Sequence, residues 1–163
     1  MVNLTSVINK QDSEKRETNI IINALPESEL TISTNGNKQV LNNDNEKCNF
    51  LFKTLDVPVQ YISHERIGKV IPNRSRVLKI KLHSKKDRDS ILEKAKLLKN
   101  MQDPINKVYI KKDVHFVYRN ENKRIQDLKR QLITNNPNNN NIKLVDGVLY
   151  NGDEVITRNT FFA

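Results

Sequence analysis

Between residues 18 and 110 the spacing of apolar residues switches repeatedly between the two-residue period of a strand and the longer period of a helix. The first segment, residues 18–27, is rich in β-branched side chains and ends at Pro26. Such a run is typical of a buried strand. The order of the segments that follow is the strongest constraint on the fold.

The next periodic segment predicts a helix over residues 43–55. Its apolar residues share one helical face, and these are Cys48, Leu51, Phe52 and Leu55. Asp44 lies in the first turn, where a negative charge is favourable. Residues 27–42, rich in Ser, Thr and Asn, are predicted to form a loop, and a weak strand is predicted at residues 61–67.

A basic turn at residues 72–75 leads into the clearest strand pattern of the chain, residues 76–82. Apolar residues alternate there with Val77, Lys79 and Lys81, which places the two lysines on the outer face. Residues 84–87 resemble a capping box and open a second helix, whose apolar face comprises Ile91, Leu92, Ala95 and Leu98. Residues 108–110 predict a last short strand.

The resulting order is strand, helix, strand, strand, helix, strand, which is the split βαβ arrangement. We therefore expect an α+β fold in which a four-stranded antiparallel sheet carries two helices on one face and leaves the other face open. Residues 117–132 predict a third helix with Ile125, Leu128 and Leu132 as its apolar stripe, and Asp-Gly between two apolar runs predicts a β-hairpin over residues 143–150. The expected parts are an N-terminal tail or linker (1–17), the sheet domain (18–112) and a C-terminal helix and hairpin appendage (113–163). For residues 1–17 the alternative is the end of a longer helix.

Positive charge is concentrated in the middle of the chain. Residues 60–130 contain 20 Lys and Arg against 8 Asp and Glu, a net charge of +12, whereas the flanking segments are weakly acidic. Such a field attracts a polyanion, most simply a nucleic acid backbone. The alternative is a solvated, lysine-rich surface.

An open sheet face in this arrangement is a common RNA platform, where aromatic side chains stack on bases. Here the strands at residues 19–25 and 76–82 contain no aromatic residue, and only Tyr109 and the less clearly placed Tyr61 could stack. We therefore predict binding mainly through phosphates, with weak base preference. The candidate contacts are Arg74, Arg76, Lys79, Lys81, Lys85, Lys86, Tyr109, Lys111, Arg119, Lys123 and Arg124. For any single cation the alternative is simple solvation, and for Tyr109 it is an edge position covered by the C-terminal segment.

Signals for catalysis are poor, and we expect no enzymatic activity, no cofactor and no metal. His64, His83 and His115 do not have metal-ligand spacing, and neither a phosphate-binding GxxxxGK[ST] loop nor a GxSxG elbow occurs. Cys48, the single cysteine, lies on an apolar helix face and is expected in the core.

Cysteine usage and hydropathy bear on location. One cysteine allows no intrachain disulfide, which favours a reducing compartment. Neither a signal peptide nor a membrane span is apparent, so no membrane partner is expected. We expect a cytoplasmic protein, with the nucleus as the alternative.

Several segments together resemble the nucleic-acid-binding region of the first-open-reading-frame proteins of LINE-type (non-LTR) retrotransposons. The family pattern R-x-x-N-[IV]-[IV]-[IV]-x-x-[LV]-P-E is matched by Arg16, Asn19, Ile20, Ile21, Ile22, Leu25, Pro26 and Glu27. A basic strand (76–82), a helix (88–99), the strand YIKKD (109–113), a basic helix (Arg119 and 123–132) and a hairpin follow in the family's order, so that the resemblance covers residues 16–155. His115 and Val117-Tyr118 depart from the pattern, since a Ser or Thr cap and acidic residues are usual there.

The resemblance implies an RNA-recognition-motif-like (RRM-like) domain that binds and chaperones single-stranded RNA, with DNA as the alternative, in ribonucleoprotein particles. In the family, self-association runs through an upstream coiled coil, which this chain does not contain. From the residues alone the competing function is a protein-interaction module that uses the sheet as a docking surface.

Overall fold

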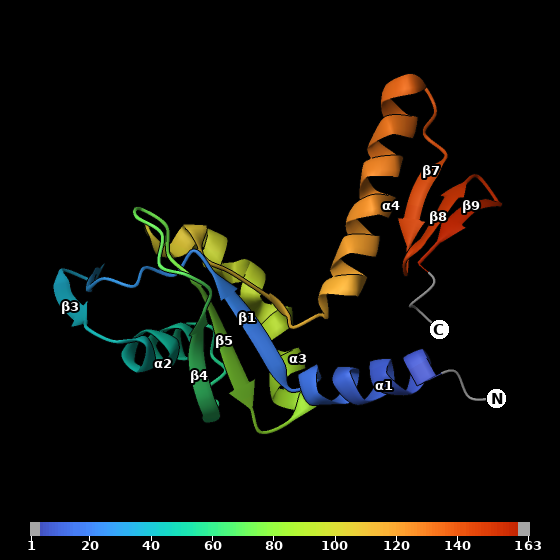
Figure 1. The fold of residues 1–163 in the computed structure, drawn as a ribbon. Coiled ribbons are helices and arrows are strands. Elements are labelled where there is room, and N and C mark those ends of the chain that lie inside the picture. Colours follow the sequence, from blue (N-terminus) through green and yellow to red (C-terminus); the bar gives the residue numbers. More distant parts are fainter. Residues whose placement is uncertain (1–3, 160–163) are drawn as a thin grey trace. The chain divides into compact units, whose positions relative to one another are not determined.

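The computed structural model describes residues 4–159, which divide after Asp113 into two compact units (Figure 1). The boundary predicted from the sequence, between residues 112 and 113, lies one residue before this division.

A four-stranded sheet forms the centre of the first unit. It consists of β1 (Asn19–Asn23), β4 (Tyr61–Ile67), β5 (Val77–Leu82) and β6 (Tyr109–Lys112), in the order β4-β5-β1-β6. All three neighbouring pairs are antiparallel. The predicted α+β class and four-stranded antiparallel sheet are therefore confirmed.

Two helices begin at side-chain caps, of which the sequence analysis predicted the one at Ser84. The Oδ1 atom of Asn43 accepts a hydrogen bond from the amide of Glu46 at 2.9 Å and starts α2 (Asp44–Thr54). The Ser84 hydroxyl accepts one from the amide of Asp87 at 3.1 Å and starts α3 (Lys85–Lys94). These bonds satisfy amides that a helix N-terminus otherwise leaves without partners. Two short 3-10 helices follow, η1 (Ala95–Asn100) and η2 (Ile105–Lys107).

The hydrophobic core lies between α2, α3 and one face of the sheet. Alternate residues of β1 and β5 point into it, because side chains alternate between the two faces of a strand. Phe52 from α2 and Ile91 from α3 meet this face, and both are buried. The core residues supplied by the two central strands are Ile20, Ile22, Leu78, Ile80 and Leu82. The remaining residues of these strands point to the opposite face of the sheet.

Two segments of the first unit differ from the sequence prediction. The predicted loop at residues 27–42 contains a two-stranded hairpin, β2 (Leu30–Thr34) and β3 (Asn37–Leu41). Asn35 and Gly36 form its turn with φ of 51° and 80°, the conformation that an Asn-Gly hairpin turn requires. Residues 1–17, predicted as a tail or linker with the end of a longer helix as the alternative, contain helix α1 (Leu4–Arg16). Arg16, in its last turn, forms an ion pair with Asp113 at 2.9 Å, which holds the helix end to the sheet.

The second unit packs a helix with a three-stranded sheet. It contains α4 (Phe116–Asn135), β7 (Ile142–Val145), β8 (Val148–Asn151) and β9 (Glu154–Arg158). The predicted Asp-Gly hairpin is confirmed, because Val145 pairs with Val148 across Asp146 and Gly147, which have φ of 47° and 75°. Strand β9 was not predicted.

Cys48 confirms its predicted core position. It is fully buried, and burial, together with the nearby Asp44 carboxylate, raises the pKa of its thiol to about 12. Among the described residues no helix is both long and apolar enough to cross a membrane.

We therefore expect the Cys48 thiol to be unreactive while the chain is folded. At pH 8 a disulfide reagent such as Ellman's reagent should label native protein at least about a hundredfold more slowly than protein in denaturant, because the thiolate is the reacting form. Stoichiometric labelling of native protein at the rate of the unfolded chain would contradict the buried position.

Candidate nucleic-acid interface

The sheet face opposite α2 and α3, hereafter the open face, carries side chains in three rows that cross all four strands. Each row is given in the strand order β4, β5, β1, β6. Row one consists of Ser63, Lys81, Asn19 and Asp113, which directly follows β6. Row two consists of Glu65, Lys79, Ile21 and Lys111, and row three of Ile67, Val77, Asn23 and Tyr109. The rows change from charged and polar to apolar and aromatic along the sheet. The open face can therefore offer two different kinds of contact at its two ends.

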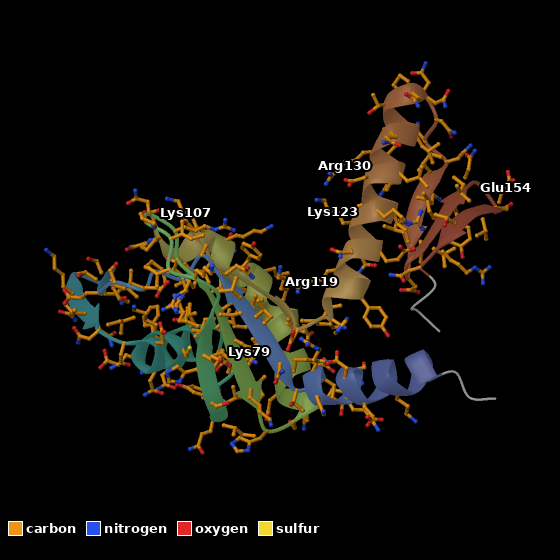
Figure 2. All side chains as sticks on the ribbon, viewed as in Figure 1. Lys79, Lys107, Arg119, Lys123, Arg130 and Glu154 are labelled. Carbon is orange, nitrogen blue, oxygen red and sulfur yellow. The ribbon has the colours of Figure 1, made fainter. Side chains whose placement is uncertain are left out.

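Acidic side chains offset part of the positive charge in the first two rows. Lys79 forms an ion pair with Glu65 at 3.4 Å (Figure 2 labels Lys79). Asp113 accepts hydrogen bonds from Arg16 and from the amide nitrogen of Asn19, each at 2.9 Å. The lysine and arginine charges at this end are thus only partly available to an external anion.

Other cations have no such partner. Lys81 and Lys111 are exposed on the open face, and Arg74 is exposed in the β4–β5 loop. None of the three forms an ion pair with any residue that the structure describes. The Lys111 ammonium lies over the Tyr109 ring, 5.9 Å from its centre, which is within the range of a cation–π contact. These three are the cations best placed to meet phosphates.

Arg76, a predicted contact, is held by Glu27. The Arg76 guanidinium and backbone amide both donate to the Glu27 carboxylate, with the ion pair at 2.8 Å. These hydrogen bonds and the positive charges of Arg76 and Arg66 lower the pKa of Glu27 to about 2. Arg76 therefore anchors the start of β5, and its charge is already compensated.

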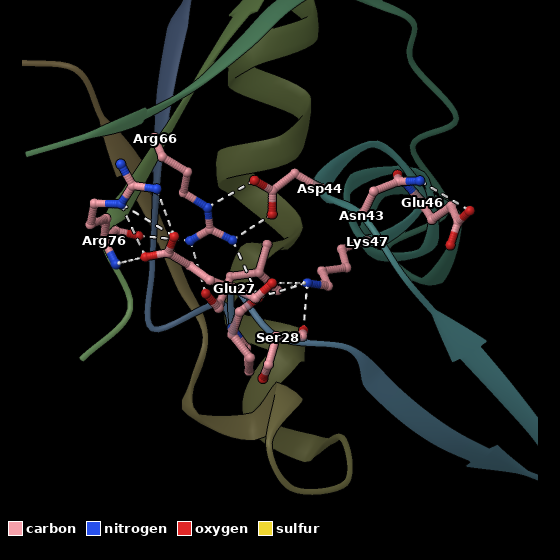
Figure 3. Close-up of polar contacts among 10 residues, drawn as sticks. Glu27, Ser28, Asn43, Asp44, Glu46, Lys47, Arg66 and Arg76 are labelled. Carbon is pink, nitrogen blue, oxygen red and sulfur yellow. Dashed lines mark hydrogen bonds and ion pairs between the residues drawn. The ribbon is translucent and has the colours of Figure 1, made fainter. Parts of the chain in front are cut away.

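A buried cluster that sequence reasoning missed lies beside this pair (Figure 3). Lys47 of α2 is fully buried, and its ammonium donates to the carbonyl oxygens of Pro26, Glu27 and Ser28 at 2.9, 3.1 and 2.7 Å. Three carbonyl acceptors satisfy all three N–H donors of a lysine. Burial lowers the pKa of this lysine, as expected for a charge removed from water.

Arg66 completes the cluster from β4. Its guanidinium forms an ion pair with Asp44 at 2.5 Å and donates to the carbonyls of Leu25 at 2.9 Å and Arg76 at 2.7 Å. Burial alone would raise the pKa of Asp44, but the hydrogen bonds and charge of Arg66 outweigh it and lower the pKa. The cluster ties together the end of β1, α2 and the two strands that carry the β4–β5 loop.

Row three forms one side of a cavity of about 570 Å³. The β4–β5 loop supplies the other side, which includes Arg74. The backbone amide of Arg74 donates to the Ile71 carbonyl at 3.2 Å and closes a turn in this loop. The sequence analysis assigned no role to Asn23. In the structure Asn23 is 8% exposed and lines this cavity.

The remaining predicted contacts lie elsewhere. Lys85 and Lys86 are exposed in the first turn of α3. Arg119, Lys123 and Arg124 belong to α4 in the second unit (Figure 2 labels Arg119 and Lys123). Arg124 is paired with Glu121 at 2.7 Å. The structure thus brings together Arg74, Arg76, Lys79, Lys81, Tyr109 and Lys111 around one sheet face.

Tyr61 does not join the open face. It pairs with Leu82, a core residue, and its ring packs edge-on against Phe52 with the ring centres 6.3 Å apart. Its hydroxyl donates to Asn45 of α2. Tyr109, which is 54% exposed, is therefore the aromatic residue that the open face presents.

Within the described part of the chain, no group of three or more His, Cys, Asp and Glu residues could hold a metal ion. Comparison of the chain with protein-family models, with curated proteins and with solved structures finds no match.

The Glu27–Arg76 pair predicts a specific dependence of stability on pH. The pKa of Glu27 is about 2 in the folded chain, against an ordinary value of 4.5, so the pair stabilises the fold above pH 4.5 and this contribution is lost as pH falls toward 2. Glu27→Gln should lower the free energy of unfolding at neutral pH and flatten its decline over that acid range, as measured by urea unfolding at several pH values.

Glu29→Gln is the matched control, because Glu29 is an exposed neighbouring carboxylate that forms no ion pair with the described residues. It should leave the pH profile of the wild-type protein unchanged. If both variants gave the same profile, the ion pair would not contribute to stability.

Proposed function

We propose that this chain is a non-enzymatic module that binds single-stranded RNA mainly through contacts to phosphates. The observation that carries the proposal is the open face, on which Lys81 and Lys111, with Arg74 at its edge, have no acidic partner among the described residues. Lysine and arginine side chains that are exposed and uncompensated are suited to neutralise phosphates.

A single strand suits this surface better than a duplex. Proteins that bind single strands combine a basic track with aromatic side chains that stack on unpaired bases. The open face places its cations beside one exposed aromatic residue, Tyr109, whose neighbours in row three are apolar or amide side chains. Bases within a duplex would not reach this ring.

We further propose that the central sheet and its two helices form the split βαβ arrangement of RRM-like domains. The strand order β4-β5-β1-β6, with α2 between β1 and β4 and α3 between β5 and β6, supports it. Together with the sequence resemblance, this supports a role as the RNA-binding and chaperone part of a LINE-type retrotransposon ribonucleoprotein.

Exposed apolar side chains in the β4–β5 loop support the competing function, a surface that docks a protein. Val70 is 74% exposed and Ile71 52% exposed. The two functions differ in their response to salt, because counterion release accompanies phosphate binding.

RNA affinity should fall steeply with salt concentration. With about four to six phosphate contacts, a plot of log affinity against log salt should have a slope of roughly −3 to −4 for a single strand. Filter binding of a labelled single-stranded RNA at several salt concentrations measures this slope. Affinity that does not change with salt would exclude the phosphate mechanism and leave the protein-docking function.

The triple variant Arg74→Gln, Lys81→Gln, Lys111→Gln locates the contacts. If each side chain meets one phosphate, the slope should become shallower by about 2 and binding should weaken for all RNA sequences alike. Thermal stability should change little, since exposed cations contribute little to folding.

A control with the same change in charge is available on other surfaces of the first unit. Lys38, Lys53 and Lys96 are exposed on β3, α2 and η1, and none forms an ion pair with the described residues. Their triple change to Gln should preserve the slope. Equal losses in the two triple variants would mean that net charge alone, and not the open face, sets affinity.

A further inference from the structure

Row three of the open face and the β4–β5 loop enclose the cavity of about 570 Å³ described above, here called the Asn23 cavity. All four strands contribute one side chain to it: Ile67, Val77, Asn23 and Tyr109. Its volume falls in the range of roughly 300–1,000 Å³ that is usual for small-molecule sites. Its volume is therefore large enough for a small planar ligand.

The side-chain amide of Asn23 is the unusual group in this cavity. Asn23 is 8% exposed, and its amide nitrogen is buried without a hydrogen-bond partner among the residues that the structure describes. A buried polar group without a partner destabilises a fold, and native structures rarely keep one. Asn19 in row one donates its side-chain nitrogen to Asp113, although its side-chain oxygen is also buried without a partner among the described residues. Asn23 differs from Asn19 in that it lines the cavity, where a ligand could supply the missing partner.

The chemistry of the lining selects a planar ligand with a polar edge. The exposed ring of Tyr109 offers a stacking surface, and Ile67 and Val77 offer apolar contact. A side-chain amide carries both donors and an acceptor, which is the pattern that matches the edge of a nucleobase. Arg74 and Lys69, also in the lining, supply positive charge for an attached phosphate.

The cavity is held in shape by contacts outside it. The β4–β5 loop begins after Arg66 and Ile67 and ends at Arg76, and both arginines are fixed by ion pairs, to Asp44 and Glu27. Arg66 also donates to the Arg76 carbonyl at 2.7 Å, which joins the two stems of the loop directly. A ligand therefore meets a wall that is already formed, which reduces the ordering cost of binding.

We infer that the Asn23 cavity binds one unpaired nucleobase of a single-stranded RNA, with Tyr109 stacking on the base and the Asn23 amide hydrogen-bonding to its edge. This inference rests on the proposed function and adds a base-binding site to a surface otherwise expected to contact phosphates. It also assigns a role to the one aromatic residue that the open face presents.

The test compares two octamers that carry the same phosphates. One is an adenosine octamer, and the other replaces every base by a stable abasic unit on the same backbone. Fluorescence anisotropy should show the wild-type protein binding the adenosine octamer about tenfold or more tightly, because stacking on one aromatic side chain contributes on this scale.

Two variants then assign the difference to the cavity. Asn23→Leu and Tyr109→Ala should each weaken binding of the adenosine octamer by about fivefold or more while leaving the abasic octamer unchanged. Asn23→Leu should also raise the melting temperature, since leucine has nearly the shape of asparagine and removes an unsatisfied polar group. A residue with only a structural role would not combine higher stability with weaker binding.

Tyr109 is exposed, so Tyr109→Ala remains folded and informative even if Asn23→Leu does not fold. Lys81→Gln is the matched control and should weaken both octamers equally. Equal, salt-dependent binding of the two octamers by wild-type protein would overturn the nucleobase site but preserve phosphate binding. Binding of neither octamer would overturn both the site and the proposed function.

Discussion

The short segment from Leu25 to Ser28 depends on two buried cations, and much of the first unit depends on that segment. Its carbonyl groups turn inward where β1 ends, and a carbonyl removed from water must find a donor. Lys47 and Arg66 supply the donors, one from α2 and one from β4. Removing either cation would leave several carbonyl acceptors without a partner, and removing Arg66 would also leave the Asp44 carboxylate unpaired. The loss of folding free energy would be far larger than that from losing a surface ion pair. The cluster therefore fixes the position of α2 against the sheet and also the stems of the β4–β5 loop.

This arrangement explains why the two ends of the open face differ. At the loop end, the buried cluster uses its polar groups internally and leaves row three with Ile67, Val77, Asn23 and Tyr109. At the other end, helix α1 brings Arg16 to Asp113, and charged side chains dominate rows one and two. Between them Ile21 is only 8% exposed, because its neighbours on the adjacent strands are Lys79 and Lys111, whose alkyl chains can shield it.

Local sequence patterns predicted what local physics determines. The cap at Ser84, the alternation in β5 and the Asp146-Gly147 turn follow from short-range rules, and the structure confirms each of them. The Asn35-Gly36 hairpin obeys the same rule, but the polar residues around it favoured a loop. The buried cluster could not be predicted, because Lys47 and Arg66 are ordinary surface residue types whose partners lie about 20 to 40 positions away. Asn23 could be placed on a face, but only the fold shows that its amide lacks a partner.

The net charge of the central segment overstates the number of cations that the surface can offer to an anion. Of its many cations, Arg66 and Arg76 hold the β4–β5 loop, and Arg88 is 8% exposed and donates to the Glu17 carbonyl at 2.7 Å. Lys79 is paired across the sheet with Glu65. Each of these charges serves the fold, and an anion can use it only by displacing its present partner. Affinity for a polyanion should therefore follow the few uncompensated side chains on the open face more closely than the net charge of +12. Under the proposed function, a surface with so few uncompensated cations gains more affinity, in proportion, from a single bound base than a strongly basic surface does.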